Sequence, residues 1–297
     1  MPNRPCTTKL AAALDVTAPG FIVTVYGDVV VPRGEVLWMG SLIEICARIG
    51  ISENQVRTAV SRLVSAGRLQ GERQGRRSFY RLAPAARSEF AQATARLYQP
   101  GLRPQGWLLL ALDEVPDEIR RRFHMAPAGG GCWLAPDWGT RPKGARLVMR
   151  VPDDSPDAMP GIAAFWDLEA LRARYDAVLG SFQPVADAVG QGGTLPGPEA
   201  LTLRLLLVHA YRAAVLRDPL LPEALLPQGW SGTRARDLFR DLYLRLTPAA
   251  GQGIASLRDN SGELPADTPQ SASRINMLQQ DDPVRSPMPE ETLHHLR

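Results

Sequence analysis

Two helix-start signals lie close together near the N-terminus, and they constrain the local fold more than any other feature of the chain. Ser41 and Glu44 have the form of a capping box, in which a hydroxyl and a carboxylate three residues apart satisfy each other's backbone donors. Ser52 and Gln55 repeat this form directly after Gly50. We therefore expect a short helix ending near Gly50, a turn, and a second helix.

The second helix is followed by a change of period. Its apolar positions recur at helical spacing as far as Gly67, a residue suited to end a helix; they are Val56, Ala59, Val60, Leu63 and Val64. Residues 68–73 and 76–82 then alternate as short strands around Gln74 and Gly75, where we predict the tight turn of a hairpin. Helix, turn, helix and hairpin is the order of a winged helix-turn-helix, expected over residues 19–99.

Positive charge is concentrated in this region. The whole chain has a net charge of only +3, yet residues 55–96 hold nine arginines against two acids, Glu72 and Glu89. Such a local excess is the electrostatic signature of a surface that meets phosphates. It indicates a nucleic-acid partner for the predicted helix and hairpin.

The predicted contacts divide into two sets. Side chains at the start and on the polar face of the second helix can bond phosphates or base edges in a major groove; they are Ser52, Asn54, Gln55, Arg57, Thr58, Ser61 and Arg62. The hairpin carries cations suited to phosphates or the minor groove; they are Arg68, Arg73, Arg76, Arg77 and Arg81. The alternatives are a solvated helix face and a hairpin that binds RNA or aids solubility.

The segments around this region are less distinctive. Residues 1–18 show no clean periodicity, so we expect a flexible arm. Residues 21–31 are apolar and β-branched, and periodicity leaves both a strand and a buried helix open. Pro84 can start a helix that runs to Leu97. The prolines and glycine of residues 100–104 then indicate a linker.

The rest of the chain completes an α+β fold. Residues 100–165 predict a small α+β domain, with strands at 107–112, 132–135 and 145–151 and a helix at 116–125. Residues 166–250 predict a helical domain, in which helices begin near Trp166, at 199 and at 231. Residues 251–297 are rich in Ser, Pro, Asp and Gln, which predicts a disordered tail.

Several classes of protein are disfavoured. The three cysteines are odd in number and widely spaced, so neither a disulfide scaffold nor a metal site is expected. The N-terminus lacks the apolar core of a signal peptide, and the run 203–208 is too short to span a bilayer. We expect a cytoplasmic protein with no membrane partner.

Four segments of the basic region resemble the PaaX repressors of phenylacetate catabolism: GDVVVPRG at 27–34, WMGSL at 38–42, VRTAVSRL at 56–63 and RRSFYRL at 76–82. Later segments resemble the same family: WDL at 166–168, HAYR at 209–212, DPLLP at 218–222 and LPQGW at 226–230. The likeness covers residues 20–248, and the tail from Gly251 to Arg297 falls outside it.

The resemblance implies a GntR-like winged helix, a central domain similar to the ferredoxin-like fold of Cas2, and a helical C-terminal domain. It implies a homodimer that binds double-stranded operator DNA and represses until an aryl-CoA thioester such as phenylacetyl-CoA binds. It implies no cofactor apart from that effector.

The effector pocket does not follow from the resemblance, but a physical candidate exists. A CoA ligand needs cations for its phosphates and an apolar slot for its acyl group. Two predicted helices offer both kinds of side chain: Trp166, Arg172, Arg174, Tyr175, His209, Tyr211 and Arg212. The alternative is that the aromatic residues complete a helical core and the arginines form surface pairs.

Two further functions are weighed against a regulator. Asp113, at the end of the first strand of the central domain, lies where a Cas2-like nuclease places a metal-binding aspartate. No other catalytic motif supports an enzyme: the sequence has no nucleophile elbow, no His-Glu-x-x-His and no phosphate loop. A nucleic-acid-binding protein without a regulatory role, for example one that binds RNA, is the second alternative. We expect a regulator that is not an enzyme.

Overall fold

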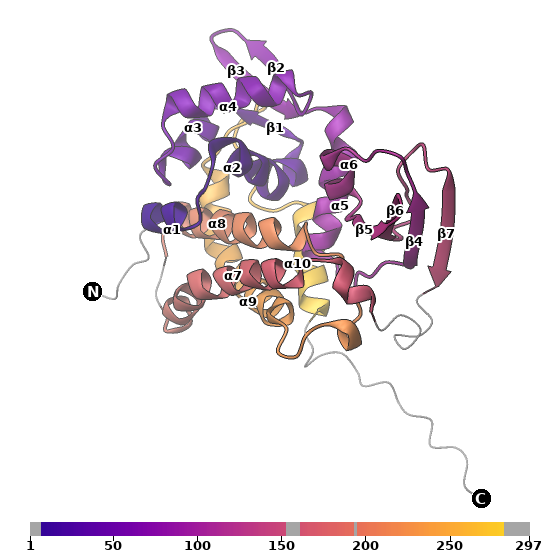
Figure 1. Ribbon diagram of the computed structural model, residues 1–297. Helices are drawn as coiled ribbons and strands as arrows, with labels where there is room; N and C mark the ends of the chain where they lie inside the picture. Colours follow the sequence, from indigo (N-terminus) through magenta and orange to yellow (C-terminus); the bar gives the residue numbers. More distant parts are fainter. Residues whose placement is uncertain (1–6, 153–160, 193–194, 282–297) are drawn as a thin grey trace, which may run out of the picture.

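The computed structural model describes residues 7–152, 161–192 and 195–281 as an α+β fold with two small antiparallel sheets beside a mainly helical body (Figure 1). The chain begins with α1 (Thr7–Ala13) and α2 (Ala18–Val25), and α2 continues through the π-helical turn η1 (Tyr26–Val30) and the 3-10 turn η2 (Val31–Arg33). Phe21, Ile22 and Val25 are fully buried. The segment that sequence left open as strand or helix is therefore a helix surrounded by other elements.

The expected flexible arm over residues 1–18 is wrong for the described part of that segment. Residues 7–13 form α1, Ala11 is buried, and Leu10 packs against the hydrophobic core. The helix is too short to show a period in sequence, and Leu10 and Ala11 gain a stable environment only once α8 lies beside them. Residues 1–6 lie outside the described residues.

The basic region forms a compact helix and sheet unit. Its elements are β1 (Val36–Trp38), α3 (Met39–Ala47), α4 (Glu53–Ser65), β2 (Leu69–Gln74), β3 (Arg77–Leu82), the 3-10 turn η3 (Pro84–Ala86) and α5 (Arg87–Tyr98). The strand order is β1-β3-β2, all antiparallel. The predicted second helix and both hairpin strands are thus confirmed.

The first predicted capping box is wrong. Helix α3 begins at Met39, ahead of Ser41, because β1 delivers the chain to the helix through Trp38. Ser41 is buried, and its hydroxyl accepts a hydrogen bond from the backbone N–H of Arg258 at 2.9 Å. The serine thus joins this unit to the C-terminal part of the chain.

The central sheet contains β4 (Gly106–Ala111), β5 (Ala126–Gly129), β6 (Cys132–Pro136) and β7 (Leu147–Pro152), in the antiparallel order β5-β6-β4-β7, with α6 (Asp117–Arg122) between β4 and β5. The three predicted strands are present, and β5 is an additional short strand. A ferredoxin-like domain has a second crossover helix, but residues 137–146 form none. Gly139, Pro142 and Gly144 explain this, because these residues disfavour a helix.

The C-terminal part consists of long helices. They are α7 (Leu168–Gly190), α8 (Gly197–Val215), α9 (Ser231–Ala255) and α10 (Pro269–Gln280), with the 3-10 turns η5 (Ile162–Phe165) and η6 (Glu223–Leu225). The expected disordered tail is wrong for residues 251–281, since α9 runs on to Ala255 and α10 packs with Leu278 fully buried. The segment that forms α10 has low hydrophobicity, so its composition did not predict a packed helix. It packs through a few side chains. Residues 282–297 lie outside the described part of the chain.

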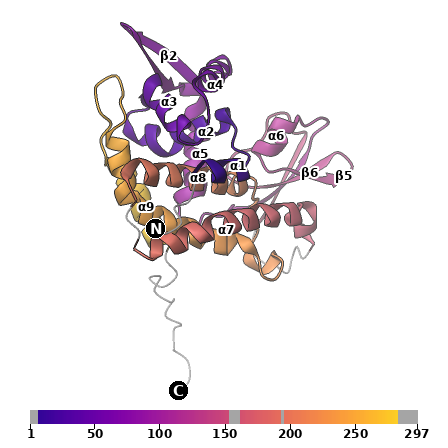
Figure 2. The ribbon, with the colours of Figure 1, turned by 90° about the vertical axis from the view of Figure 1, so that its left-hand side faces the viewer.

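One hydrophobic core extends from α1–α5 through α7, α8, α9 and α10. The segments 19–99 and 166–250, expected as separate domains, therefore share their interior. The central sheet has its own smaller apolar clusters. Figure 2 shows the β2–β3 hairpin projecting from the end of the molecule that lies away from α7 and α9. This places the most basic element at the periphery.

Candidate nucleic-acid interface

Helix α4 presents a polar face because four of its five predicted apolar side chains are buried, while Val64 is 38% exposed. Ser52 caps the helix by accepting from the N–H of Gln55, and the Gln55 side chain accepts from the Ser52 N–H at 2.8 Å. The buried side chains are Val56, Ala59, Val60 and Leu63. This fixes the rotation of the helix and leaves the predicted contact residues exposed: Asn54, Gln55, Arg57, Thr58, Ser61 and Arg62.

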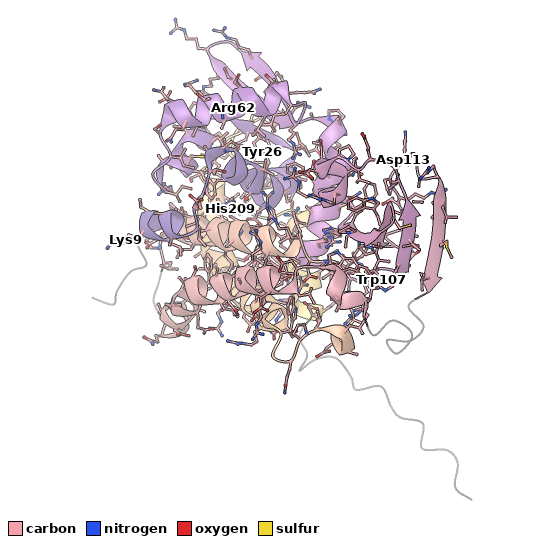
Figure 3. All side chains as sticks on the ribbon, viewed as in Figure 1. Lys9, Tyr26, Arg62, Trp107, Asp113 and His209 are labelled. Atoms are coloured by element: carbon pink, nitrogen blue, oxygen red, sulfur yellow. The ribbon has the colours of Figure 1, made fainter. Side chains whose placement is uncertain are left out.

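These exposed side chains are not equally available. Ser52 and Gln55 share the capping box, so the Gln55 amide oxygen is engaged. Arg57 forms an ion pair with Glu53 at 2.7 Å, one turn earlier on the same helix. Arg62, labelled on α4 in Figure 3, has no ion pair within the described part of the chain. Because exposed ion pairs contribute little stability, the Arg57 guanidinium can leave Glu53 for a stronger acceptor.

The hairpin turn differs by one residue from the predicted position. Gln74 pairs with Arg77, so the two loop residues are Gly75 and Arg76 rather than Gln74 and Gly75. Gly75 has φ of +60°, as the first position of a type II′ turn requires, and glycine adopts this conformation without strain. Arg76 therefore stands at the tip of the hairpin.

The hairpin arginines fall into two groups. Arg68 pairs with Glu89 at 2.8 Å, and Arg81 pairs with Glu72 at 3.2 Å, so the base of the hairpin is charge-balanced. Near the tip, Arg73, Arg76 and Arg77 form no ion pair with a carboxylate of the described residues. There, the Arg73 Nε donates to the Gly75 carbonyl, and Arg77 lies 5.5 Å from the centre of the Trp38 ring. The uncompensated charge is concentrated at the projecting end.

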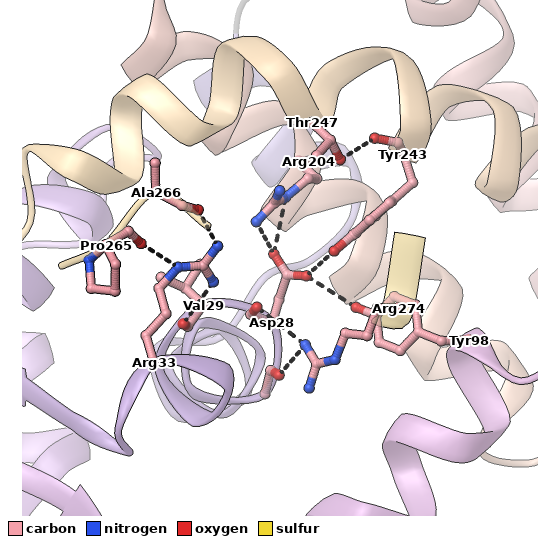
Figure 4. A network of polar contacts seen from close by, with 11 residues as sticks. Asp28, Val29, Arg33, Tyr98, Arg204, Tyr243, Thr247, Pro265, Ala266 and Arg274 are labelled. Atoms are coloured by element: carbon pink, nitrogen blue, oxygen red, sulfur yellow. Dashed lines mark hydrogen bonds and ion pairs between the residues drawn. The ribbon is translucent and has the colours of Figure 1, made fainter. Parts of the chain in front are cut away.

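Sequence reasoning missed a buried carboxylate in the turn after α2, which links this unit to the C-terminal helices. Asp28, in the π-helical turn after α2, accepts hydrogen bonds from the hydroxyls of Tyr98 and Tyr243 at 3.0 and 2.8 Å (Figure 4). Arg274 of α10 donates to the carbonyl oxygens of Gly27 and Asp28. Burial alone would raise the pKa of Asp28, but the surrounding arginines and tyrosine hydroxyls hold that pKa below its usual value. The one sequence signal was an acid inside an apolar run.

The seven residues proposed for an effector do not share one pocket. Tyr175 and Tyr211 are buried in an aromatic cluster, where the Tyr175 hydroxyl donates to Asp218 at 2.7 Å and Tyr211 stacks on Phe239. His209 lies instead against α2. Its Nδ1 is 3.0 Å from the hydroxyl of Thr24, and burial beside Arg212 lowers its pKa to about 4.

The other members of that set lie elsewhere. Trp166 donates to the carbonyl of His124 at 2.9 Å and packs on Trp107 of the central sheet. Arg172 is 4.0 Å from Asp176 on the outside of α7, and Arg174 is exposed on the same helix. Within the described residues these side chains are therefore dispersed over the aromatic cluster, α2, the central sheet and the outside of α7.

A separate cleft of about 330 Å³ lies beside α6 in the central domain. Its apolar lining comes from Leu112, Val115, Pro116, Ile119, Phe123 and Pro142. Three cations, Arg122, Arg141 and Lys143, and one acid, Glu114, complete the lining. Arg141 and Lys143 form no ion pair in the parts of the chain described. The cleft therefore combines an apolar surface with positive charge.

The features of an enzyme are weak. Asp113 is exposed and forms an ion pair with Arg146 at 2.8 Å. Residues 7–152, 161–192 and 195–281 contain no group of three or more His, Cys, Asp or Glu side chains arranged to hold a metal ion. Within the same residues no single helix is long and apolar enough to cross a membrane; α1 and the helical segment 18–33 reach that threshold only as a pair bent by 116°.

A capped helix with an exposed polar face beside a projecting arginine hairpin defines a candidate nucleic-acid-binding protein. Comparison with known proteins indicates that this protein is a transcriptional regulator. Residues 17–86 match the family described as PaaX-like protein, and residues 166–256 match the PaaX-like protein C-terminal domain. The chain is 31% identical over 283 residues to the transcriptional repressor PaaX of Escherichia coli strain K12, covering 86% of this chain and 88% of that protein.

This chain belongs to the PaaX family of transcriptional repressors and is a regulator rather than an enzyme. Among solved structures, the uncharacterized protein Rv0674 from Mycobacterium tuberculosis is 21% identical, with a TM-score of 0.45, covering 78% of this chain and 97% of that one.

Proposed function

We propose that this protein is a sequence-specific DNA-binding repressor of phenylacetate-type catabolic genes, with residues 19–99 acting as a winged helix-turn-helix. The observation that carries the proposal is the arrangement of α4 and the β2–β3 hairpin. The helix exposes Asn54, Thr58 and Arg62 on one stripe. The β2–β3 hairpin projects beyond the helix (Figure 1), and Arg76 lies in its turn. In such proteins a helix enters the major groove while the hairpin follows the backbone or minor groove.

The repressor acts as a cytoplasmic homodimer on a palindromic operator. A two-fold axis in the protein matches a two-fold axis in the DNA, and each copy supplies one reading helix to one half-site. Family membership supports the repressor role, and the shared core supports transmission of a signal to α4, since α2 contacts both α4 and α8.

The effector of this proposal is an aryl-CoA thioester, such as phenylacetyl-CoA, which releases the DNA. The cleft beside α6 is a better place for it than the seven dispersed residues. Its apolar lining suits an aryl group, and Arg122, Arg141 and Lys143 suit phosphates. Phe123 lines the cleft and adjoins His124, whose carbonyl accepts from Trp166 at the start of the helical body. This contact gives a bound ligand a route to that body.

The test is a titration of the full chain with the promoter duplex of its own gene cluster and with a random duplex over a series of salt concentrations. We expect preference for the promoter, weakening steeply with salt, and release by phenylacetyl-CoA but not by CoA alone. Equal affinity for both duplexes would contradict the repressor. Retained preference with no thioester effect would contradict only the effector.

A further inference from the structure

The chain after α9 passes along the basic helix and sheet unit and then returns to α9. We call residues 257–281, which include α10, the strap. The strap starts just after the C-terminal end of α9, and its last residue, Asp281, accepts hydrogen bonds from Arg236 and Arg240 in the first half of that helix. Both ends of the strap are therefore fixed to the helical body.

The first part of the strap lies along the free edge of the small sheet. β1 stands at one edge of the order β1-β3-β2. The N–H of Trp38 donates to the carbonyl of Arg258, and the N–H of Arg258 donates to the hydroxyl of Ser41, both at 2.9 Å. Figure 2 shows this part of the strap rising beside α3. Because an edge strand has backbone groups free for pairing, the strap holds the sheet at the edge opposite β2.

The second part of the strap holds the turn after α2. Arg33 is buried, and its Nε and Nη2 donate to the carbonyl oxygens of Pro265 and Ala266 at 2.8 and 2.7 Å (Figure 4). The hydroxyl of Thr268 donates to the carbonyl of Pro32 at 2.9 Å. Separating the strap from this turn would leave a buried guanidinium without two of its acceptors, which is costly. The turn and the strap therefore stay together in the folded chain.

Two separate attachments thus join the basic helix and sheet unit to the helical body. One is α2, which packs against both α4 and α8. The other is the strap, which reaches the β1 edge and the turn at Arg33. A unit held at one place can rotate about that place, whereas a second attachment apart from the first prevents the rotation. The strap is therefore suited to fix the direction in which α4 faces.

We propose that the strap fixes the orientation of α4 relative to the helical body, with Arg33, Ser41 and Thr268 as positioning residues for operator binding. This rests on the proposed two-fold repressor. In a dimer on a palindrome, both α4 helices must face their half-sites at one spacing. A loosened strap leaves each α4 able to bind a half-site but lets the pair accept other spacings. The strap thereby sets the half-site spacing that the dimer selects.

The tests use matched variants of the full chain. Ser41→Ala/Thr268→Ala removes the two hydroxyls that join the strap to the rest of the chain. Thr247→Ala/Ser256→Ala is the control, because it removes the same two kinds of hydroxyl, which donate to carbonyl oxygens of α9. Arg33→Lys is a second strap variant that leaves the N-terminal cap of α10 intact. It keeps the charge but lacks the planar fork that reaches two carbonyls.

The first test measures orientation without DNA. Spin labels are attached at Arg62→Cys on α4 and Arg174→Cys on α7 in a chain whose other cysteines are replaced, and the labelled chain is diluted with unlabelled chain. The width of the distance distribution between the labels reports how firmly α4 is held. We expect the strap variants to broaden it at least about twofold and the control to leave it as in the parent chain. Equal widths in strap variants and control would overturn the proposal.

The second test measures spacing selection. Affinities are compared for a duplex with the half-site spacing that the wild-type chain selects, for duplexes with base pairs inserted or removed between the half-sites, and for a single half-site. We expect the strap variants to lower the ratio of selected to altered spacing at least about threefold, with single half-site affinity within about twofold of wild type. An unchanged ratio, or an equal loss on the single half-site, would overturn the proposal. A wild-type chain without spacing preference, combined with broadened distances in the strap variants, would contradict the repressor model while supporting the role of the strap in holding α4.

Discussion

The guanidinium of Arg204 holds the carboxylate of Asp28 through two nitrogens, with Nε 3.1 Å and Nη2 2.9 Å from Oδ2. Both side chains are buried, at 3% and 0% exposure. Arg204 lies in the middle of α8 and Asp28 lies directly after α2, the helix against which α4 packs. The pair therefore connects the C-terminal helices to the support of the candidate reading helix.

Replacing Asp28 with Asn is expected to lower the free energy of unfolding by about 3 to 5 kcal/mol, because Arg204 would remain a buried cation without its counter-charge. Chemical denaturation at neutral pH measures this loss. Asp113→Asn removes an exposed pair and serves as the control, with an expected loss of about 1 kcal/mol or less. Similar losses for the two variants would mean that the Asp28 pair contributes no more to the free energy of unfolding than an exposed ion pair.

The same carboxylate predicts a pH dependence. The pKa of Asp28 is lower in the folded state than in the unfolded chain, so its contribution is present above the unfolded value of about 4 and is lost as pH falls through the folded value. The stability difference between wild type and Asp28→Asn should therefore shrink as pH falls below about 4. A constant difference over this range would argue against a lowered pKa.

His209 predicts a second pH effect at milder acidity. Its folded pKa is about 4, against about 6.5 in an unfolded chain. Between these values the unfolded chain binds a proton that the folded protein does not, so stability should fall as pH is lowered from 6.5 to 4. His209→Gln should remove about 2 to 3 kcal/mol of that fall. Thermal denaturation at several pH values measures it, and an unchanged slope would contradict a buried neutral imidazole.

We expect Arg76, at the hairpin tip, to contribute equally to the affinity for specific and for random DNA. Arg76→Ala should weaken specific and random DNA to the same degree and reduce the slope of log affinity against log salt by about one unit, the share of one phosphate contact. Arg81→Ala, at the charge-balanced base, is the comparison and should change the slope less. A selective loss of the specific duplex on replacing Arg76 would assign base reading to the hairpin.

Arg57 tests the reading role of α4. Arg57→Ala should reduce discrimination between specific and random DNA by about 1 to 3 kcal/mol. Arg57→Lys keeps the charge but cannot make the paired contacts of a guanidinium, so it should retain random binding and lose most of the discrimination. If Arg57→Lys discriminates like wild type, Arg57 contacts phosphate only.

Local signals predicted helix α4 and the β2–β3 hairpin. The Ser52 box and the apolar spacing of α4 are formed within one helix, and the hairpin follows from alternation around a glycine turn. Ser41 shows the limit of the same reasoning. Its spacing to Glu44 matches a capping box, yet its hydroxyl bonds Arg258, a residue far along the chain.

The network around Asp28 could not be predicted for the same reason. Its members come from α5, α8, α9 and α10. Only the folded chain brings the Tyr98 and Tyr243 hydroxyls to the Asp28 carboxylate and the Arg274 guanidinium to the Asp28 backbone carbonyl. The ordering of α10 likewise depends on contacts made by Arg274 and Leu278 rather than on its own hydrophobicity. Composition describes the isolated segment, whereas packing decides whether it is ordered.

The most direct test of DNA reading by α4 and the hairpin is a comparison of two double variants of equal charge on a duplex that the wild-type chain selects from a randomised pool. Arg62→Ala/Arg76→Ala removes cations of the proposed interface, and Arg172→Ala/Arg174→Ala removes two from α7. We predict that the first variant loses about tenfold or more in affinity and that the second stays within about twofold of wild type. Equal losses in both variants, or a loss in the second alone, would contradict the proposed interface.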